Sequence, residues 1–260
     1  MLRRASDQRA GGRWKALCEG KVELYRHHEV RAADKLATIG VPRWLEANLS
    51  IGSRQFHLAD GRWYEIGERF LPEITRTVTR VIRPTASVEL PPWEPGQDEG
   101  DYNLRVPREC PDQGYVCLDK RNVPNPLKSP DSLEICDLLA EDGTLILVKR
   151  ANRSDALSHL FSQAQVAVRM LMNNPDVRER FANKVAEVAG RRIISADFKP
   201  TRLVFAILLK HGMELTTNSL FAFSQVTLAE TVKELESWGV QVEVVGIKVR
   251  SLAELESTAL

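Results

Sequence analysis

The apolar run RLVFAILL, residues 202–209, is the feature that most constrains the fold of this chain. Only its first residue is charged. An uninterrupted apolar run of this length is typical of a β-strand that is buried on both faces. Such a strand lies inside a sheet whose two sides are covered by other elements, so the run predicts an α/β or α+β core.

Regular elements surround this strand from residue 132 onward. The predicted strands are residues 133–139 and 144–150, joined by the loop AEDG, and residues 240–249. Helical spacing of apolar residues predicts helices over 154–172, 176–189 and within 220–238. The order β-β-α-α-β-α-β describes a mixed sheet with flanking helices, of which the restriction-endonuclease-like fold is one form.

The preceding residues divide into two regions. Residues 55–58 and 63–66 flank Asp60-Gly61, a dipeptide favoured in tight hairpins, and residues 68–81 carry one apolar stripe. With a further strand expected within 21–30, residues 16–83 are predicted to form a smaller hairpin-helix region. Residues 84–131 hold most of the 13 prolines and predict an irregular connector wrapped on the surface. The mixed α/β domain then covers residues 132–260.

Composition excludes several classes of protein. The 36 Lys and Arg residues against 35 Asp and Glu residues give a net charge of +1, which argues against binding by global basicity. No apolar stretch has the length of a membrane span, and the N-terminus lacks the apolar segment of a signal peptide, so a cytoplasmic location is expected. The four cysteines match neither a zinc spacing nor a disulfide framework.

Acids and a lysine stand on the two strands of the second predicted hairpin. Asp137 lies on the first strand and Lys149 on its antiparallel partner, so both are expected on one sheet face near one end. Glu134, three residues before Asp137, is placed on the opposite face by strand alternation. This arrangement outlines the site of PD-(D/E)xK nucleases, in which carboxylates hold Mg²⁺ and the lysine orients or activates water.

One position departs from that nuclease pattern. The second acid is expected two residues before the lysine, and this chain carries Leu147 there. Leucine cannot ligate a metal, so Glu134, or an acid from the preceding region such as Asp119, has to substitute. The plain alternative is a solvated acid and lysine paired across the hairpin, worth roughly a few tenths of a kcal/mol.

The predicted helix after the hairpin adds polar candidates. His159 and Gln163 are four residues apart and share a helix face, with Ser158 beside them, and a histidine can carry protons near neutral pH. Arg150 and Arg153 belong to a basic stretch that predicts contact with nucleic-acid phosphates, and Ser158 is assigned to the same nucleic-acid contact. The alternative interpretation is an exposed polar face of an amphipathic helix with solvated charges.

Several sequence blocks resemble, in series, those of a sporadically distributed family of uncharacterised bacterial and prophage-borne proteins. The blocks are DGRWYEIGERFL, LPPW with DEGDYN, LDKRNV, LEICDLLAEDGTLILVKR and SDALSHLFSQA. They span residues 60–172, and the resemblance continues toward the C-terminus. Members are usually longer at the N-terminus, so the chain is expected to correspond to their C-terminal half and to be a truncated form of a longer protein.

The resemblance implies little about activity. The patchy distribution of the family implies mobile elements or anti-phage defence. The family often carries histidine two residues before the lysine, in HVK, where this chain has Leu147, and this departure bears on whatever activity the family has. The positions that match the family blocks are Glu134, Asp137, Lys149, Ser158, His159 and Gln163.

Three functional hypotheses remain open. The first is a nuclease-related protein that acts on nucleic acid, with Glu134 and Asp137 binding Mg²⁺, Lys149 activating water, and His159 and Gln163 completing the site. The second is a non-catalytic module with a degenerate nuclease-like fold that binds nucleic acid or a protein. The third is a structural protein of a phage particle.

Overall fold

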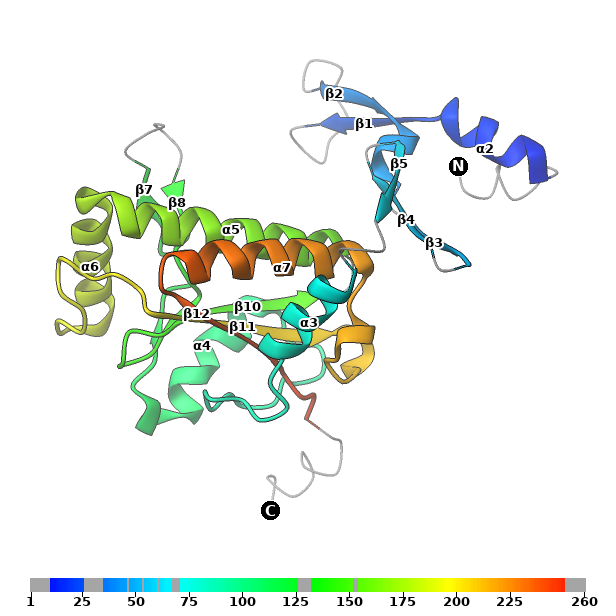
Figure 1. Ribbon diagram of the computed structural model, residues 1–260. Helices are drawn as coiled ribbons and strands as arrows, with labels where there is room; N and C mark the ends of the chain where they lie inside the picture. Colours follow the sequence, from blue (N-terminus) through cyan, green and yellow to red (C-terminus); the bar gives the residue numbers. More distant parts are fainter. Residues whose placement is uncertain are drawn as a thin grey trace. The chain divides into compact units, whose positions relative to one another are not determined.

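The structure is a computed structural model that describes residues 10–25, 35–45, 47–52, 54–59, 61–66, 71–125, 132–151 and 154–250 (Figure 1). The chain divides into two compact units, Met1–Pro72 and Glu73–Leu260. Residues 84–131 therefore belong to the same unit as the C-terminal elements. None of the helices in the described ranges combines the length and apolar character that a membrane crossing requires.

The first unit consists mainly of short antiparallel strands. Helix α2 (Ala10–Cys18) precedes a hairpin of β1 (Lys21–Tyr25) and β2 (Lys35–Gly40), followed by the short 3-10 helix η2 (Val41–Trp44). Strands β3 (Ala47–Ile51), β4 (Arg54–Ala59) and β5 (Arg62–Ile66) form a three-stranded sheet. The predicted hairpin is confirmed: Leu58 pairs with Trp63, and Gly61 takes the positive φ of +74° that its turn requires. Asp60 lies outside the described residues.

A five-stranded mixed sheet organises the second unit. Its order is β12-β11-β10-β9-β6, with β10 (Leu145–Ala151), β11 (Arg202–Leu209) and β12 (Gln241–Gly246) parallel to one another. Strands β9 (Leu138–Leu139) and β6 (Val116–Cys117) add antiparallel pairs at one edge. A separate two-stranded ladder joins β7 (Val123–Pro124) to β8 (Ser132–Leu133). The mixed α/β fold expected from the apolar run is confirmed.

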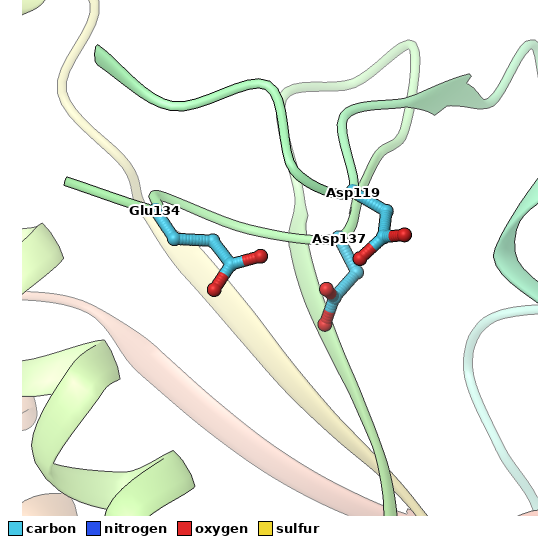
Figure 2. Close-up of side chains that lie close together, drawn as sticks. All are labelled: Asp119, Glu134 and Asp137. Atoms are coloured by element: carbon cyan, nitrogen blue, oxygen red, sulfur yellow. The ribbon is translucent and has the colours of Figure 1, made fainter. Parts of the chain in front are cut away.

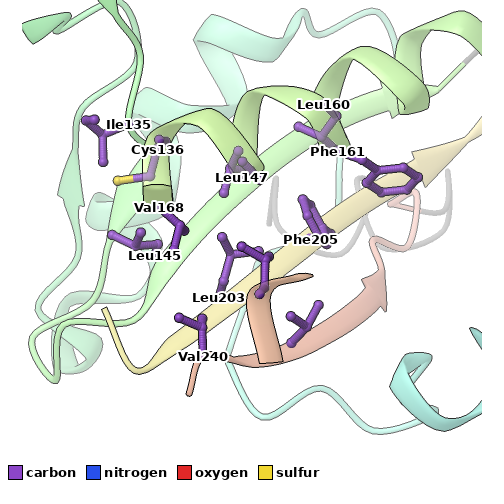
Figure 3. Close-up of a cluster of buried hydrophobic side chains, with 14 of the residues drawn as sticks. Ile135, Cys136, Leu145, Leu147, Leu160, Phe161, Val168, Leu203, Phe205 and Val240 are labelled. Atoms are coloured by element: carbon purple, nitrogen blue, oxygen red, sulfur yellow. The ribbon is translucent and has the colours of Figure 1, made fainter. Parts of the chain in front are cut away.

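Helices cover both faces of this sheet. One face is covered by α3 (Leu71–Val81), α5 (Ser154–Asn173), α6 (Pro175–Ala189) and α7 (Ala222–Ser237). Phe205 of β11 and Leu147 of β10 face the core that these helices form. In this core the ring of Phe161 packs edge to face against that of Phe205 (Figure 3). Val204 and Val148 face the opposite core, formed with α4 (Glu99–Glu109). Both cores exclude water from β11, which explains why its sequence lacks polar alternation.

The prediction of an irregular surface connector over residues 84–131 is wrong for much of this segment. Asp98 caps α4, because its carboxylate accepts a hydrogen bond from the Asp101 backbone N–H at 2.8 Å. Trp93 and Tyr102 are buried and stacked, with ring centroids 4.3 Å apart. Tyr102 also donates a hydrogen bond to the carbonyl of Pro91 at 2.9 Å. Part of this segment therefore belongs to the core on the second face of the sheet.

Candidate metal centre

Asp137 lies where β9 ends against β10. Its backbone N–H donates to the carbonyl of Ile146 at 3.1 Å, and its carboxylate oxygen Oδ2 accepts from the backbone N–H of Val148 at 2.7 Å. The side chain thus takes the place that a strand carbonyl would occupy if the ladder continued. Two anchors on one strand hold the carboxylate beside Val148, in the middle of β10.

Glu134 reaches the same point, contrary to the expectation from alternation. The predicted strand 133–139 is broken into β8 and β9, and residues 134–137 between them are not extended in a ladder. The period of two therefore does not apply to Glu134 and Asp137, and their carboxylates converge instead of lying on opposite faces (Figure 2). The sequence pattern could not reveal this break, since LEICDLL reads as one apolar strand.

Asp119 supplies the third carboxylate. The backbone N–H of Leu118 donates to the carbonyl of Asp137 at 2.7 Å, and that of Arg121 donates to the carbonyl of Leu118 at 2.9 Å, which closes a turn. Lys120 adopts a left-handed φ of +57° in this turn. Asp119, Glu134 and Asp137 each offer an oxygen, and these atoms lie within 4.8 Å of one another (Figure 2).

Burial dominates the electrostatics of this cluster. Asp137 is only 8% exposed, and this loss of hydration raises its pKa to about 7. The hydrogen bond from Val148 acts in the opposite direction, while the negative charges of Glu134 and Asp119 raise the pKa further. Asp137 therefore holds a proton over part of the neutral range, and a divalent cation among the three carboxylates would favour its ionised form.

Lys149 points to an acid that the sequence analysis missed. Its Nζ lies 2.8 Å from Oε2 of Glu99, the first residue of α4, and Oε1 of Glu99 accepts from the backbone N–H of Arg150 at 3.0 Å. Glu99 therefore joins the start of α4 to the end of β10. The available signal was the DEGDYN block, in which Asp98 is a typical helix cap and Glu99 a first-turn acid.

The polar candidates on α5 separate into two groups. Gln163 donates from Nε2 to Oε2 of Glu134 at 2.9 Å, so it supports the carboxylate cluster. His159 lies one turn earlier on α5 and is exposed, and within the described ranges it forms no hydrogen bond or ion pair with the three carboxylates. Ser158 is half-buried on the same helix.

The two predicted arginines contribute less to the geometry. Arg150 is exposed, and its guanidinium donates to the carbonyl of Gln97 at 3.4 Å. Arg153 lies outside the described residues. A phosphate-binding role for either one stays a prediction.

Leu147 is fully buried in the core beneath α5. The residue two positions before Lys149 therefore contributes to the hydrophobic core in this chain. An acid at this position would lose its hydration, which is energetically costly. Asp119, which enters from the turn after β6, is the acid that joins Glu134 and Asp137. Three carboxylates offer the oxygen ligands that Mg²⁺, Mn²⁺ or Ca²⁺ prefers.

Comparisons with known proteins give a family without an assigned activity. A family model described as "Family of unknown function (DUF6119)" matches residues 1–248. No curated protein and no solved structure shows a significant match.

Proposed function

The chain belongs to DUF6119, a family of unknown function, and we propose that it is a Mg²⁺-dependent nuclease related to the PD-(D/E)xK enzymes. One observation carries the proposal. Asp119, Glu134 and Asp137 come from two separate segments and converge beside β10, the strand that carries Lys149. Paired carboxylates and a lysine are the residue types that phosphodiester hydrolysis requires.

The carboxylates would hold the cation. Asp137 is the most constrained ligand because Val148 fixes one of its oxygens, and Glu134 is oriented by Gln163. Bound Mg²⁺ would supply Lewis-acid stabilisation of the charge that develops on the phosphate. Since the metal competes with the proton on Asp137, this centre gains affinity as the pH rises toward 7.

Lys149 and Glu99 form the second part of the site. The 2.8 Å ion pair orients the ammonium, and the hydrogen bond from Arg150 fixes the other oxygen of Glu99. An ammonium held in this way can orient an attacking water or stabilise negative charge on a phosphate oxygen. Glu99 acts through Lys149 and is a positioning residue.

The order of elements supports the nuclease relationship. In the sheet, β9 pairs antiparallel with both β6 and β10. Along the chain, β10 is followed by α5, which covers the sheet, and later by β11, which pairs parallel with β10. The acid precedes the second of these strands and the lysine lies on the third, as the PD-(D/E)xK pattern requires. A place in anti-phage defence or on a mobile element stays a proposal from the sequence resemblance.

The test is a cleavage assay on the full chain with single-stranded and duplex DNA and RNA, with and without Mg²⁺. We expect Mg²⁺-dependent cleavage that Asp137→Asn and Lys149→Met each reduce by about 100-fold or more. Glu73→Gln, an exposed acid on α3, is the matched control and should retain wild-type activity. Cleavage that is insensitive to Asp137 and Lys149 would refute the proposed mechanism.

A non-catalytic binding module is the second candidate. The burial of Leu147 favours it, because the position of the second nuclease acid serves the core. This candidate predicts that the chain binds nucleic acid or protein, and that Mg²⁺ produces no cleavage. The same assay, with binding measured in parallel, separates the two functions.

A further inference from the structure

A cleft of about 740 Å³ opens beside the carboxylate cluster. Its walls come from one face of α4, from the turn after β6 and from the segment at the end of α6. Asp119 belongs both to the wall of the cleft and to the three-carboxylate cluster. Whatever occupies the cleft is therefore held next to the candidate cation site.

Charge is distributed unevenly along this cleft. The acids Asp98 and Asp101 lie at the start of α4, on the side of Asp119, whereas Arg108 lies near its end. Arg108 follows Asp101 by seven positions, which corresponds to about 10 Å along the helix axis. The side of Asp119 also carries Lys120, whose Nζ lies 4.0 Å from the Asp119 carboxylate, and Arg121. The cleft therefore combines carboxylates that suit a cation with basic side chains that suit phosphates.

Two arginines of the cleft are available for an anion. Arg108 and Arg121 are exposed, and within the described part of the chain neither guanidinium lies within 4.0 Å of a carboxylate, although the charge of Glu187 acts on Arg121. Arg191, by contrast, is held by Glu141 at 2.7 Å. Solvated arginine forks in a concave site are the usual partners of phosphate oxygens.

The remaining wall is apolar. Leu104 is 55% exposed and Val188 is 37% exposed, although each lines the cleft. Apolar side chains between charged groups suit a ligand that alternates phosphates with sugars and bases.

Size decides between one strand and two. A cleft of this volume falls within the range of about 300–1,000 Å³ that holds molecules of small-ligand size. A DNA duplex is much larger, since its major groove alone is about 12 Å wide. We propose that the cleft binds one or two nucleotides of single-stranded nucleic acid, with Arg108 and Arg121 on the phosphates and the strand directed toward Asp119. The choice of a polynucleotide as ligand rests on the proposed function.

Binding in EDTA tests the cleft without catalysis. Fluorescence anisotropy of the full chain would use labelled 12-mers of oligodeoxythymidylate and oligouridylate, and the corresponding duplexes as competitors. We expect the single strands to bind at least tenfold more tightly than the duplexes. Arg108→Ala and Arg121→Ala should each lower the slope of log affinity against log salt by about 0.7, the value for one phosphate contact on a single strand.

Arg76→Ala is the matched control, since Arg76 is exposed on α3 and does not line the cleft. Equal binding of duplex and single strand, or salt slopes unchanged in both cleft variants, would overturn the inference. Strand binding that depends on Arg108 and Arg121 without any Mg²⁺-dependent cleavage would support the cleft and refute the nuclease. Mg²⁺-dependent cleavage that neither Arg108→Ala nor Arg121→Ala alters would support the nuclease and refute the role of the cleft.

Discussion

Oε2 of Glu99 lies 2.8 Å from Nζ of Lys149, although 50 residues separate them in the chain. The contact connects the first turn of α4 to the last part of β10, the strand whose Val148 backbone N–H donates to Asp137. Both side chains are about one-third exposed, so the pair contributes little to stability. Its main consequence is the orientation of the ammonium.

Glu99→Gln tests that orientation. The amide retains the shape of the side chain but removes its charge, so we expect the cleavage rate to fall by about 100-fold while the free energy of unfolding changes by less than about 1 kcal/mol. Glu236→Gln, which weakens the comparably exposed pair with Arg80, should alter stability to a similar extent and leave cleavage intact. Equal activity of both variants would contradict a positioning role for Glu99.

The raised pKa of Asp137 makes stability depend on pH. Because the pKa of Asp137 is about 7 in the folded protein and 3.8 for an ordinary aspartic acid, the folded state binds more protons than the unfolded state between these limits. Without divalent metal, the contribution of Asp137 to stability is therefore greatest below pH 4 and is lost as the pH rises toward 7. Urea unfolding in EDTA should show this loss, at most about 1.4 kcal/mol per pH unit.

Asp137→Asn isolates this effect from other titrating groups. Its amide oxygen can still accept from Val148, so the fold is retained while the titration is removed. The difference between wild type and variant should thus vary with pH between 4 and 7. An identical pH dependence in both proteins would show that Asp137 titrates normally.

Mg²⁺ affinity should rise over the same pH interval. Binding displaces the proton on Asp137, so the association constant should increase by up to about tenfold per pH unit below pH 7 and level off above it. Isothermal titration calorimetry with Mg²⁺ at several pH values measures this slope. Asp112→Asn, a change on an exposed acid outside the cluster, should retain the wild-type slope.

Gln163 should affect the metal more than His159 does. Gln163→Leu removes the donor that orients Glu134, and loss of such a supporting group typically lowers metal affinity by about 10–100-fold. His159→Ala, on an exposed residue one turn away, should leave Mg²⁺ binding unchanged. The reverse order of effects would indicate that α5 presents a different face to the site.

Leu147→Asp should fail to restore the missing nuclease acid. The side chain is fully buried under α5, and an isolated carboxylate there is expected to lower the free energy of unfolding by roughly 3 kcal/mol or more. Leu147→Met, which conserves volume, should lower it by less than about 1.5 kcal/mol. Denaturant unfolding separates these outcomes, and a stable Leu147→Asp protein with improved Mg²⁺ binding would refute the assignment of this position to the core.

Local pattern predicted the central elements because their physical causes are local. The run 202–209 has no polar residue after Arg202, and it became β11 with the same bounds. Apolar spacing likewise predicted α5, α6 and α7 to within a few residues at each end, and Gly190 ends α6 in the left-handed conformation. Burial of a whole face gives such elements a strong period in sequence.

The region 84–131 shows where this reasoning stops. Its prolines suppress the helical and strand periods, yet Trp93, Tyr102 and Val106 pack beneath the sheet and place Glu99 against Lys149. That arrangement depends on contacts across many residues, which a local pattern does not encode.

The sequence by itself therefore determined the mixed sheet, its covering helices and the acid and lysine at the ends of β9 and β10. Only the tertiary structure decided that Glu134 and Asp137 converge and that Asp119 and Glu99 join them. The physical reason is that strand alternation holds only while a ladder continues. Just before β9 the ladder stops, and the carboxylate of Asp137 accepts from Val148, so long-range hydrogen bonds set the side-chain direction there.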